Sequence, residues 1–366
     1  MDKTYIETIR QIGSLLETAN IPYHFTGAAS LALQQVELQD YSEIKVSVQW
    51  DLFKEARQVF EEFLPSEAEE APDRALFRFE ADRIDVSVFC LYNTTIKTNP
   101  YRISVVSEGG EFWCLSLYSY LYEKEMAIFK RSIHQHLESL QKGLTAKNEQ
   151  AWNQDNYLAL LNRFGKPEEL AEKIRANPWW RLHPFYKYLG STDGKKITHL
   201  MGSNGVKAVS LAVLGAEVRV ADFSRENAAF ANELAEAAGV NLEYIVSDVL
   251  SLPENLLDGQ QEIVLMELGV LHYMIDLAPL LNTVRSMLKP GGRFVLHEFH
   301  PISTKLITST GKKHKVTGDY FSPELEKHSV AFSKHKPDDK RDSLSEVIQR
   351  KWTIGELVTW PGWFSH

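Results

Sequence analysis

The stretch THLMGSNGVKAVSLAVLGA, Thr198 to Ala216, has the pattern of a strand, a turn with glycines and a helix. In a parallel sheet such a turn lies at the carboxyl edge, where backbone N–H groups and a helix N-terminus bind anions or polar cofactor groups. Gly202 and Gly205 are spaced G-x-x-G, so the G-x-G-x-x-G dinucleotide fingerprint is not met. The turn therefore predicts a cofactor-binding edge without identifying the cofactor.

The rest of the C-terminal half repeats this alternation of strand and helix. The predicted strands are ITHLMG, EVRVAD, LEYIVSD, EIVLMEL and GGRFVLHEF, with helices such as RENAAFANELAEAAG and LAPLLNTVRSMLK between them. Strands that alternate with helices of about ten to fifteen residues are typical of a parallel sheet covered on both faces. We therefore expect an α/β fold with a Rossmann-like, doubly wound sheet.

Two aspartates follow consecutive strands of this predicted sheet. Asp222 ends the second strand and is placed to accept hydrogen bonds from a ribose diol, as in sites for NAD and for S-adenosylmethionine. Asp248 follows the third strand. Capping of the next helix is the alternative role for both residues, because carboxylates also serve as N-caps.

Four segments together resemble a known family, the class I S-adenosylmethionine-dependent methyltransferases. The resemblance covers roughly Ile197 to Ser303, and LKPGGRFVL, Leu288 to Leu296, is its most specific part. It implies S-adenosylmethionine as the cofactor and methyl transfer as the activity. The four segments, in chain order, are VRVADFS (218–224), SDVLSLP (247–253), EIVLMELGVLHY (262–273) and MLKPGGRFVLHEF (287–299).

The resemblance also implies roles for individual residues at the adenosine end of the cofactor. Asp222 would accept hydrogen bonds from the ribose hydroxyls, and Phe223 would lie against the adenine ring. Asp248 would accept from the adenine amino group, with Val249 beside the ring.

At the methionine end, the resemblance implies that Gly202 and Gly205 let the backbone approach the cofactor closely. Glu267, Leu268 and Gly269, at the end of the fourth strand, would border the reactive methyl group.

The glycine loop departs from the family pattern. In that pattern an acidic residue two positions before the first glycine helps to hold the cofactor's amino group, and more glycines follow. Here His199, Met201 and Ser203 occupy this frame. The resemblance therefore describes the adenosine end better than the methionine end.

Four residues at the carboxyl edge are candidates for a general base. A sulfonium methyl group is already activated, so such an enzyme mainly aligns the nucleophile and removes its proton where it carries one. The alternative for each histidine is a packed or hydrogen-bonded structural role. We expect no metal at HEFH, since His297 and His300 would point to opposite faces of a strand. The four candidate bases are His272, Tyr273, Glu298 and His300.

The C-terminal region shows a second departure. RKWTIGELVT (350–359) resembles the helix before the last two strands of the family, with Thr353 and Glu356 as a capping box. The remaining WPGWFSH is too short for the antiparallel pair that closes the sheet. We expect the sheet to lack its last two strands and to expose an edge, covered by a lid, the first domain or a second subunit in a homodimer.

The run from Lys305 to Arg341 has nine Lys and Arg against five Asp and Glu, a net charge of +4. We expect a solvated loop or lid, with a basic surface for an acidic partner as the alternative.

In the N-terminal half, FTGAASLALQ, EIKVSVQWD and RIDVSVF resemble the polymerase-β-like minimal nucleotidyltransferases. That family holds magnesium on a D-x-D pair and a third carboxylate; here the matching positions are Glu43, Lys45 and Asp85. An ammonium group cannot bind Mg²⁺. We therefore expect a smaller α/β domain that is catalytically degenerate and serves binding or assembly; retained nucleotidyl transfer and an unrelated fold are the alternatives.

Length and composition limit the function further. The 366 residues suggest two domains, which we place at 1–147 and 186–366, with a helical linker and leading helices at 148–185. A net charge of −9 disfavours a surface that tracks a polyanion, and Cys90 and Cys114 form no metal or disulfide pattern. We expect a cytoplasmic methyltransferase, without a membrane partner, that acts on a small molecule. RNA or protein acceptors and a non-catalytic cofactor-binding protein are the alternatives.

Overall fold

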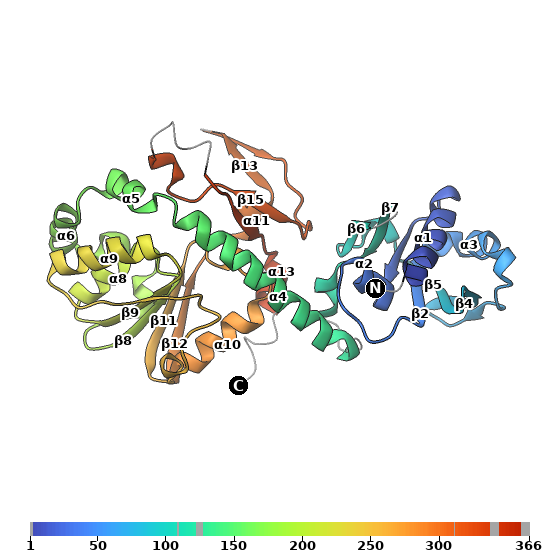
Figure 1. The fold of residues 1–366 in the computed structure, drawn as a ribbon, viewed down its shortest axis with the longest axis horizontal. Coiled ribbons are helices and arrows are strands. Elements are labelled where there is room, and N and C mark those ends of the chain that lie inside the picture. The colour runs from blue at the N-terminus through green and yellow to red at the C-terminus, as the bar shows by residue number, and fades with distance from the viewer. Residues whose placement is uncertain (1–2, 108–109, 122–126, 311, 337–343, 360–366) are drawn as a thin grey trace. The chain divides into compact units, whose positions relative to one another are not determined.

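The computed structural model describes residues 3–107, 110–121, 127–310, 312–336 and 344–359 (Figure 1). The chain forms two compact units: residues 1–139 with 321–323, and residues 140–320 with 324–366. Within the described residues, no helix is both long enough and apolar enough to cross a bilayer.

The N-terminal unit is built on a seven-stranded mixed sheet with the order β3-β4-β5-β2-β1-β7-β6. Helices and strands alternate over residues 3–59 and further strands follow, in keeping with the expected smaller α/β domain. Asp82 and Arg83, both with positive φ, form the turn between β4 and β5. The elements are α1 (Lys3–Thr18), β1 (Tyr23–Thr26), α2 (Gly27–Leu33), β2 (Glu43–Val48), α3 (Phe53–Val59), β3 (Glu69–Glu70), β4 (Arg74–Ala81), β5 (Ile84–Leu91), β6 (Arg102–Ser107) and β7 (Gly110–Leu115).

The C-terminal unit is built on a five-stranded sheet in which all neighbours are parallel, with the order β10-β9-β8-β11-β12. The chain leaves β8 (Lys196–Leu200) toward β9 (Glu217–Asp222) and β10 (Glu243–Val246), then returns to β11 (Gln261–Glu267) and β12 (Leu288–His297) on the other side. This reversal opens a crevice at the carboxyl ends of β8 and β11. The predicted doubly wound sheet is confirmed.

Helices cover both faces of this sheet because its interior strand β11 is apolar on both sides. On β11, Ile263 and Leu265 face α8 (Val206–Val213), whereas Val264 and Met266 face α10 (Leu277–Met287). All four side chains are essentially buried, and each such burial stabilises the fold by about 1.5–3 kcal/mol. An outer layer of α5 (Asn156–Phe164) and α6 (Pro167–Ala176) packs on α9 (Arg225–Ala238). The helix α4 (Ala127–Trp152) precedes this layer.

The basic run after the sheet forms more regular structure than the predicted loop. After α11 (Pro301–Lys305) come a hairpin of β13 (Ile307–Thr310) and β14 (Lys313–Val316), then β15 (Leu325–His328), which pairs antiparallel with β16 (Val347–Arg350). Part of the run, residues 337–343, lies outside the described residues. The expected solvated loop or lid therefore contains short strands, of which β14 is exposed along its whole length.

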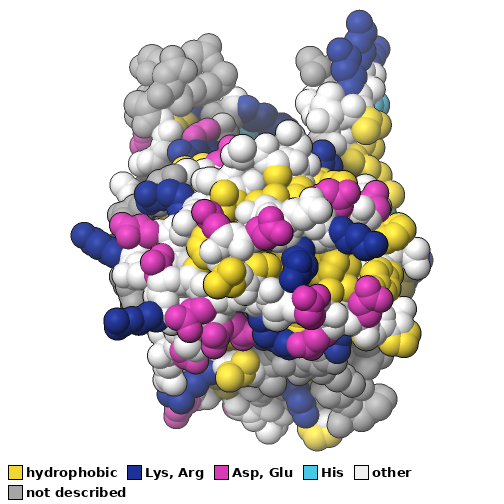
Figure 2. Space-filling view, turned by 90° about the vertical axis from the view of Figure 1, so that its right-hand side faces the viewer, with side chains coloured by type: hydrophobic (Ala, Val, Ile, Leu, Met, Phe, Trp, Pro, Cys, Tyr) yellow, Lys and Arg dark blue, Asp and Glu magenta, His cyan; other side chains and the backbone are white. Residues whose placement is uncertain are grey.

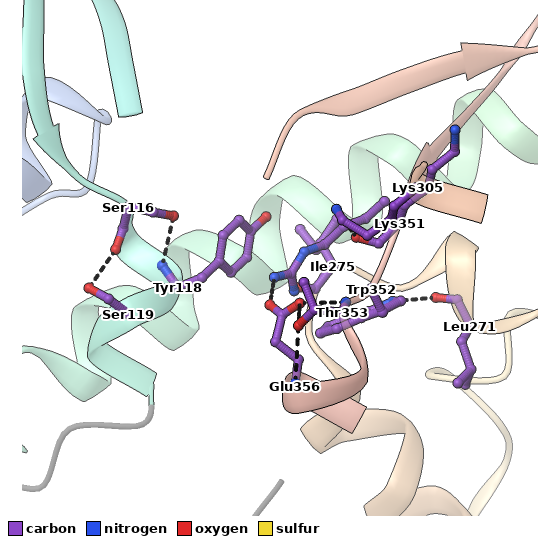
Figure 3. A network of polar contacts seen from close by, with 11 residues as sticks. Ser116, Tyr118, Ser119, Leu271, Ile275, Lys305, Lys351, Trp352, Thr353 and Glu356 are labelled. Carbon is purple, nitrogen blue, oxygen red and sulfur yellow. Dashed lines mark hydrogen bonds and ion pairs between the residues drawn. The ribbon is translucent and has the colours of Figure 1, made fainter. Parts of the chain in front are cut away.

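The predicted capping box is confirmed at the start of α13 (Ile354–Thr359), as Figure 3 shows. The Glu356 backbone N–H donates to Thr353 Oγ1 at 3.2 Å, and the Thr353 backbone N–H donates to Glu356 Oε2 at 2.9 Å. Glu356 also forms a buried ion pair with Arg350. Trp352 Nε1 donates to the Leu271 carbonyl at 2.9 Å, which ties this segment to the loop after β11.

Two expectations about strand ends have different outcomes. Among the described residues β12 pairs only with β11, so it is an edge of the sheet there; WPGWFSH, residues 360–366, lies outside the described residues.

The placement of His300 on the same strand as His297 is wrong. The strand ends at His297, and His300 is the N-cap of α11, where its Nδ1 accepts from the Ile302 N–H at 3.2 Å.

Charged side chains of both signs lie side by side on the face shown in Figure 2, with hydrophobic side chains between them. No single-sign patch dominates the described part of this face, in keeping with the mixed composition of the chain. Such a surface offers little to a polyanion.

Candidate active site

A cavity of about 690 Å³ lies at the carboxyl ends of β8, β9 and β11. It combines the predicted cofactor edge with segments from both ends of the C-terminal unit. The lining residues are Trp152, Arg163, Phe164 and Arg181 before the sheet; Met201–Asn204, Val206 and Lys207 after β8; Asp222 and Phe223 after β9; Glu267–Val270, His272 and Tyr273 after β11; Phe299, Ser303 and Thr304 after β12; and His328, Ser329, Ala331, Phe332, Gln349 and Lys351 near the C-terminus.

The loop after β8 keeps a glycine-type backbone conformation at residues that are not glycine. Met201 and Ser203 have φ of 52° and 49°, and Gly205 follows at 71°. The left-handed region costs an ordinary residue on the order of 1–2 kcal/mol. These positions lie in the frame where the resembled family has its glycines, so residues other than glycine adopt the left-handed conformation here.

Gly205 has a packing role that the sequence did not predict. A Cβ added there would lie 2.5 Å from Ala231 Cβ on α9, and Gly205 is absent from the cavity lining. Gly205 therefore permits close packing of the loop on α9, and its close approach to the cofactor stays a prediction. Gly202 does line the cavity.

Asp222 joins two loops of the site. Its Oδ2 accepts from the Ser203 N–H at 3.1 Å, and its Oδ1 accepts from the Ser224 N–H at 2.9 Å. The N-cap of α9 is Ser224, so the capping alternative does not describe Asp222. Burial raises the pKa of its carboxyl group, although these N–H donors act in the opposite direction.

The predicted adenine residues lie partly outside the main cavity. Phe223 lines it, whereas Asp248 and Val249 line an adjacent space of about 10 Å³, roughly one water probe. Asp248 Oδ1 accepts from the Leu250 N–H at 3.0 Å, a turn contact, and burial raises its pKa. An adenine ring at this edge would therefore require side chains to move apart.

The end of β11 carries the predicted Glu267, Leu268 and Gly269, and all three line the cavity. Glu267 forms an ion pair with Lys207, the second residue of α8. On the other side, His199 Nε2 lies 3.9 Å from Glu267 Oε1. His199 is buried, which lowers its pKa to about 4, so the imidazole is neutral at pH 7.

The four candidate bases separate into two groups. His272 and Tyr273 line the cavity, whereas Glu298 and His300 are absent from its lining. The carboxylate of Glu298 accepts from the backbone N–H groups of the loop after β11, so it holds that loop in place.

The two cavity-lining candidates differ in their protonation. Burial lowers the pKa of His272, so its imidazole is neutral and able to take a proton at pH 7; the ring stacks on Phe299 with centroids 6.5 Å apart. Burial raises the pKa of Tyr273, which therefore keeps its proton, and its hydroxyl accepts from Trp152 Nε1 at 3.0 Å. His272 is the more suitable base.

Several lining residues were missed in the sequence, for two reasons. The arginines and aromatic rings before the sheet, such as Arg181 in NPWWRLHPF, lie more than fifteen residues from any motif. His328 and Lys351 come from the basic run and the strand after it. These segments are rich in aromatic and cationic residues, and this composition was the one sequence feature that could have indicated their place in the site. Among the described residues, no group of three or more His, Cys, Asp or Glu side chains could hold a metal ion.

Comparison with known proteins places a recognised domain over this cavity. The family model described as "Methyltransferase domain" matches residues 201–296. The chain is 35% identical over 109 residues to the demethylmenaquinone methyltransferase of Thermus thermophilus, covering 29% of this chain and 48% of that protein. It is 26% identical over 138 residues to the ubiquinone biosynthesis O-methyltransferase of Bordetella pertussis, covering 38% of this chain and 56% of that protein.

One solved structure with similarity is an S-adenosylmethionine-dependent methyltransferase from Mesorhizobium loti, at 22% identity and a TM-score of 0.38, covering 50% of this chain and 79% of that one. The chain spans about half the length of the curated relatives it matches. The residues that the family model matches include most of the sheet and several of the loops that line the cavity. Residues 201–296 of the C-terminal unit therefore match a methyltransferase domain.

Proposed function

We propose that this protein transfers the methyl group of S-adenosylmethionine to a small aromatic acceptor. The observation that carries the proposal is the cavity of about 690 Å³, in which Gly202, Asp222 and Glu267 lie with a neutral His272. When bound there, the cofactor would supply a methyl group on a positively charged sulfur. Asp222 would hold the ribose, because its two oxygens offer about four acceptor sites and two are used by backbone N–H groups.

Aromatic side chains favour a flat, apolar acceptor. Trp152, Phe164, Phe299 and Phe332 line the same cavity as the proposed base. Rings of this kind stack on aromatic ligands in offset or edge-to-face arrangements. The names of the relatives, a demethylmenaquinone methyltransferase and a ubiquinone biosynthesis O-methyltransferase, support an acceptor of the phenol or quinone class. His272 would take the proton from an acceptor hydroxyl as the methyl group is transferred.

Isothermal titration tests the cofactor half of the proposal. Wild-type protein is expected to bind S-adenosylhomocysteine, and Asp222→Ala to bind it about 100-fold more weakly, since two charge-assisted hydrogen bonds of about 1.5 kcal/mol each are lost. The matched control is Asp85→Ala in the N-terminal unit, which is expected to leave the affinity unchanged. Absence of binding by the wild-type protein would refute the proposal.

Turnover tests the acceptor half. With a labelled methyl group and a panel of hydroxylated aromatic compounds, His272→Gln should lower turnover about 100-fold with little change in cofactor affinity. Tight cofactor binding without turnover on any acceptor would favour the alternative, a non-catalytic cofactor-binding protein.

We further propose that the N-terminal unit is a degenerate nucleotidyltransferase-like domain with a binding or assembly role. Glu43 and Asp85 are register partners on the parallel strands β2 and β5, as a pair of metal ligands would be. Lys45 Nζ lies 2.9 Å from Glu43 Oε2, which supports a site that repels Mg²⁺. Incorporation of label from nucleoside triphosphates by the purified protein would contradict this role.

The edge strand β12 supports a homodimer in which a second subunit covers the sheet. Light scattering that gives a monomer mass at micromolar concentration would exclude it.

A further inference from the structure

Two arginines that line the cavity, Arg163 and Arg181, form no ion pair with the residues that the structure describes. Arg163 lies near the end of α5, and Arg181 ends the 3₁₀ turn η5 (Pro178–Arg181). Neither guanidinium forms an ion pair or a hydrogen bond with any residue that the structure describes. The Nε of Arg181 is buried without a hydrogen-bond partner. A buried donor of a charged group is costly to leave unpaired, so the cavity around Arg181 suits an anion.

The surroundings hold Arg181 in place. Its Cζ lies 4.4 Å from the centre of the Trp180 ring and 5.4 Å from that of Phe164. The turn η5 packs against α8, the helix that follows the loop after β8. Burial and the nearby charge of Arg163 both lower the pKa of Arg181. A bound anion would relieve the repulsion between the two cations.

A carboxylate lines the same cavity and lies near enough to Arg181 to raise its pKa. Glu267 lines the cavity and attracts the Arg181 charge. Its direct partner is Lys207, whose side chain is flexible and able to release a carboxylate oxygen to a bound ammonium group. The cavity thus combines a carboxylate with two unpaired guanidinium groups, which is complementary to an α-amino acid in its zwitterionic form.

We propose that Arg181, supported by Arg163, binds the α-carboxylate of the cofactor's methionine portion and that Glu267 binds its α-ammonium group. The inference rests on the proposed function. Guanidinium groups bind carboxylates through two parallel hydrogen bonds, which fixes the orientation of the ligand. His199 occupies the position where the family pattern has an acidic residue, and its imidazole is buried and neutral. Glu267, on a different strand, would therefore supply the negative charge that binds the ammonium group.

Isothermal titration with two ligands tests this assignment. S-adenosylhomocysteine has the amino-acid portion, whereas 5′-methylthioadenosine lacks it. Arg181→Gln should weaken binding of S-adenosylhomocysteine about tenfold or more and change that of 5′-methylthioadenosine less than about twofold. Glu267→Gln should likewise weaken binding of S-adenosylhomocysteine more than that of 5′-methylthioadenosine. The matched control is Arg285→Gln, an exposed arginine on α10 outside the cavity lining, which should affect neither ligand.

Each outcome has a separate meaning. Equal weakening of both ligands by Arg181→Gln would overturn the inference, because the residue would then act through the loop or the fold; unchanged affinity for S-adenosylhomocysteine would also overturn it. If the wild-type protein bound neither ligand, the proposed function itself would fail. If Arg181→Lys bound S-adenosylhomocysteine more tightly than Arg181→Gln but less tightly than the wild-type protein, the result would agree with the assignment. The lysine ammonium keeps the positive charge but lacks the paired N–H donors of the guanidinium group.

Discussion

Each unit of this protein has a lysine–glutamate pair at a strand, and the two pairs differ in their surroundings. Lys45 and Glu43 on β2 have side chains 46% and 42% exposed. Lys207 and Glu267 are 19% and 11% exposed and line a cavity of about 690 Å³. Water therefore screens the attraction between Lys45 and Glu43 strongly, whereas it screens the attraction between Lys207 and Glu267 much less. The same two residue types therefore form an ordinary surface contact in one unit and part of a candidate site in the other.

The largest expected effect concerns a feature that the two units share. His24 in β1 and His199 in β8 are both buried, and burial lowers the pKa of each to about 4. The unfolded chain takes up these protons near pH 6.5, so the stabilisation is complete above that pH and is lost as the pH falls toward 4. The loss is about 3 kcal/mol per histidine, from about 1.4 kcal/mol for each pKa unit.

Denaturant unfolding at pH 7 and at pH 4.5 would measure this effect. His199→Gln should reduce the acid sensitivity of the C-terminal unit, and His24→Gln that of the N-terminal unit. An equal pH dependence in the wild-type protein and both variants would show that these imidazoles are hydrated and titrate normally.

A smaller effect is expected from adding a methyl group at Gly205. The new Cβ would lie 2.5 Å from Ala231 Cβ at a φ of +71°, so Gly205→Ala should lower the free energy of unfolding by about 2–3 kcal/mol. Gly239→Ala is the matched control, because Gly239 has a φ of +72° and nothing within 4 Å of the added atom. It should cost only about 1 kcal/mol. Equal costs in urea titrations would mean that the loop and α9 move apart freely.

The smallest effect returns to the two ion pairs. Lys45→Met should change the free energy of unfolding by less than about 0.5 kcal/mol, as is usual for exposed pairs. Lys207→Met should cost about 1–2 kcal/mol, because Glu267 would remain partly buried without its cation. The same urea titrations measure both. A change below 0.5 kcal/mol for Lys207→Met would indicate that cavity water solvates Glu267 well.

The fold of the C-terminal unit was predictable because its signals are local. EIVLMEL is apolar on both sides of a strand, as a central parallel strand must be, and Asp222 ends a strand before a capped helix. The capping box at Thr353 also depends on residues three positions apart. The strands β14 and β15 were missed because their residues are mostly polar and are exposed or half-buried, which leaves no apolar alternation to indicate a strand.

The candidate site was only partly predictable because it joins distant segments. Asp222, Glu267 and His272 lie at or just after the ends of strands. The alternation of strands and helices in the sequence predicts where these strands end. Arg181 and Lys351 reach the same cavity from opposite ends of the unit. Glu298 and His300 lie outside the cavity lining and bind backbone N–H groups, a detail that no residue pattern shows.

The loop after β8 has a consequence for how such sites are recognised. Its left-handed residues include a methionine and a serine, so the geometry resides in the torsion angles and is only partly visible in the letters. A residue other than glycine is strained at these positions, so it is tolerated only where neighbouring contacts offset the strain. One such contact is the hydrogen bond that Tyr244 donates to the Ser203 carbonyl. A search by torsion angle would find this loop where a search by glycine spacing passes over it.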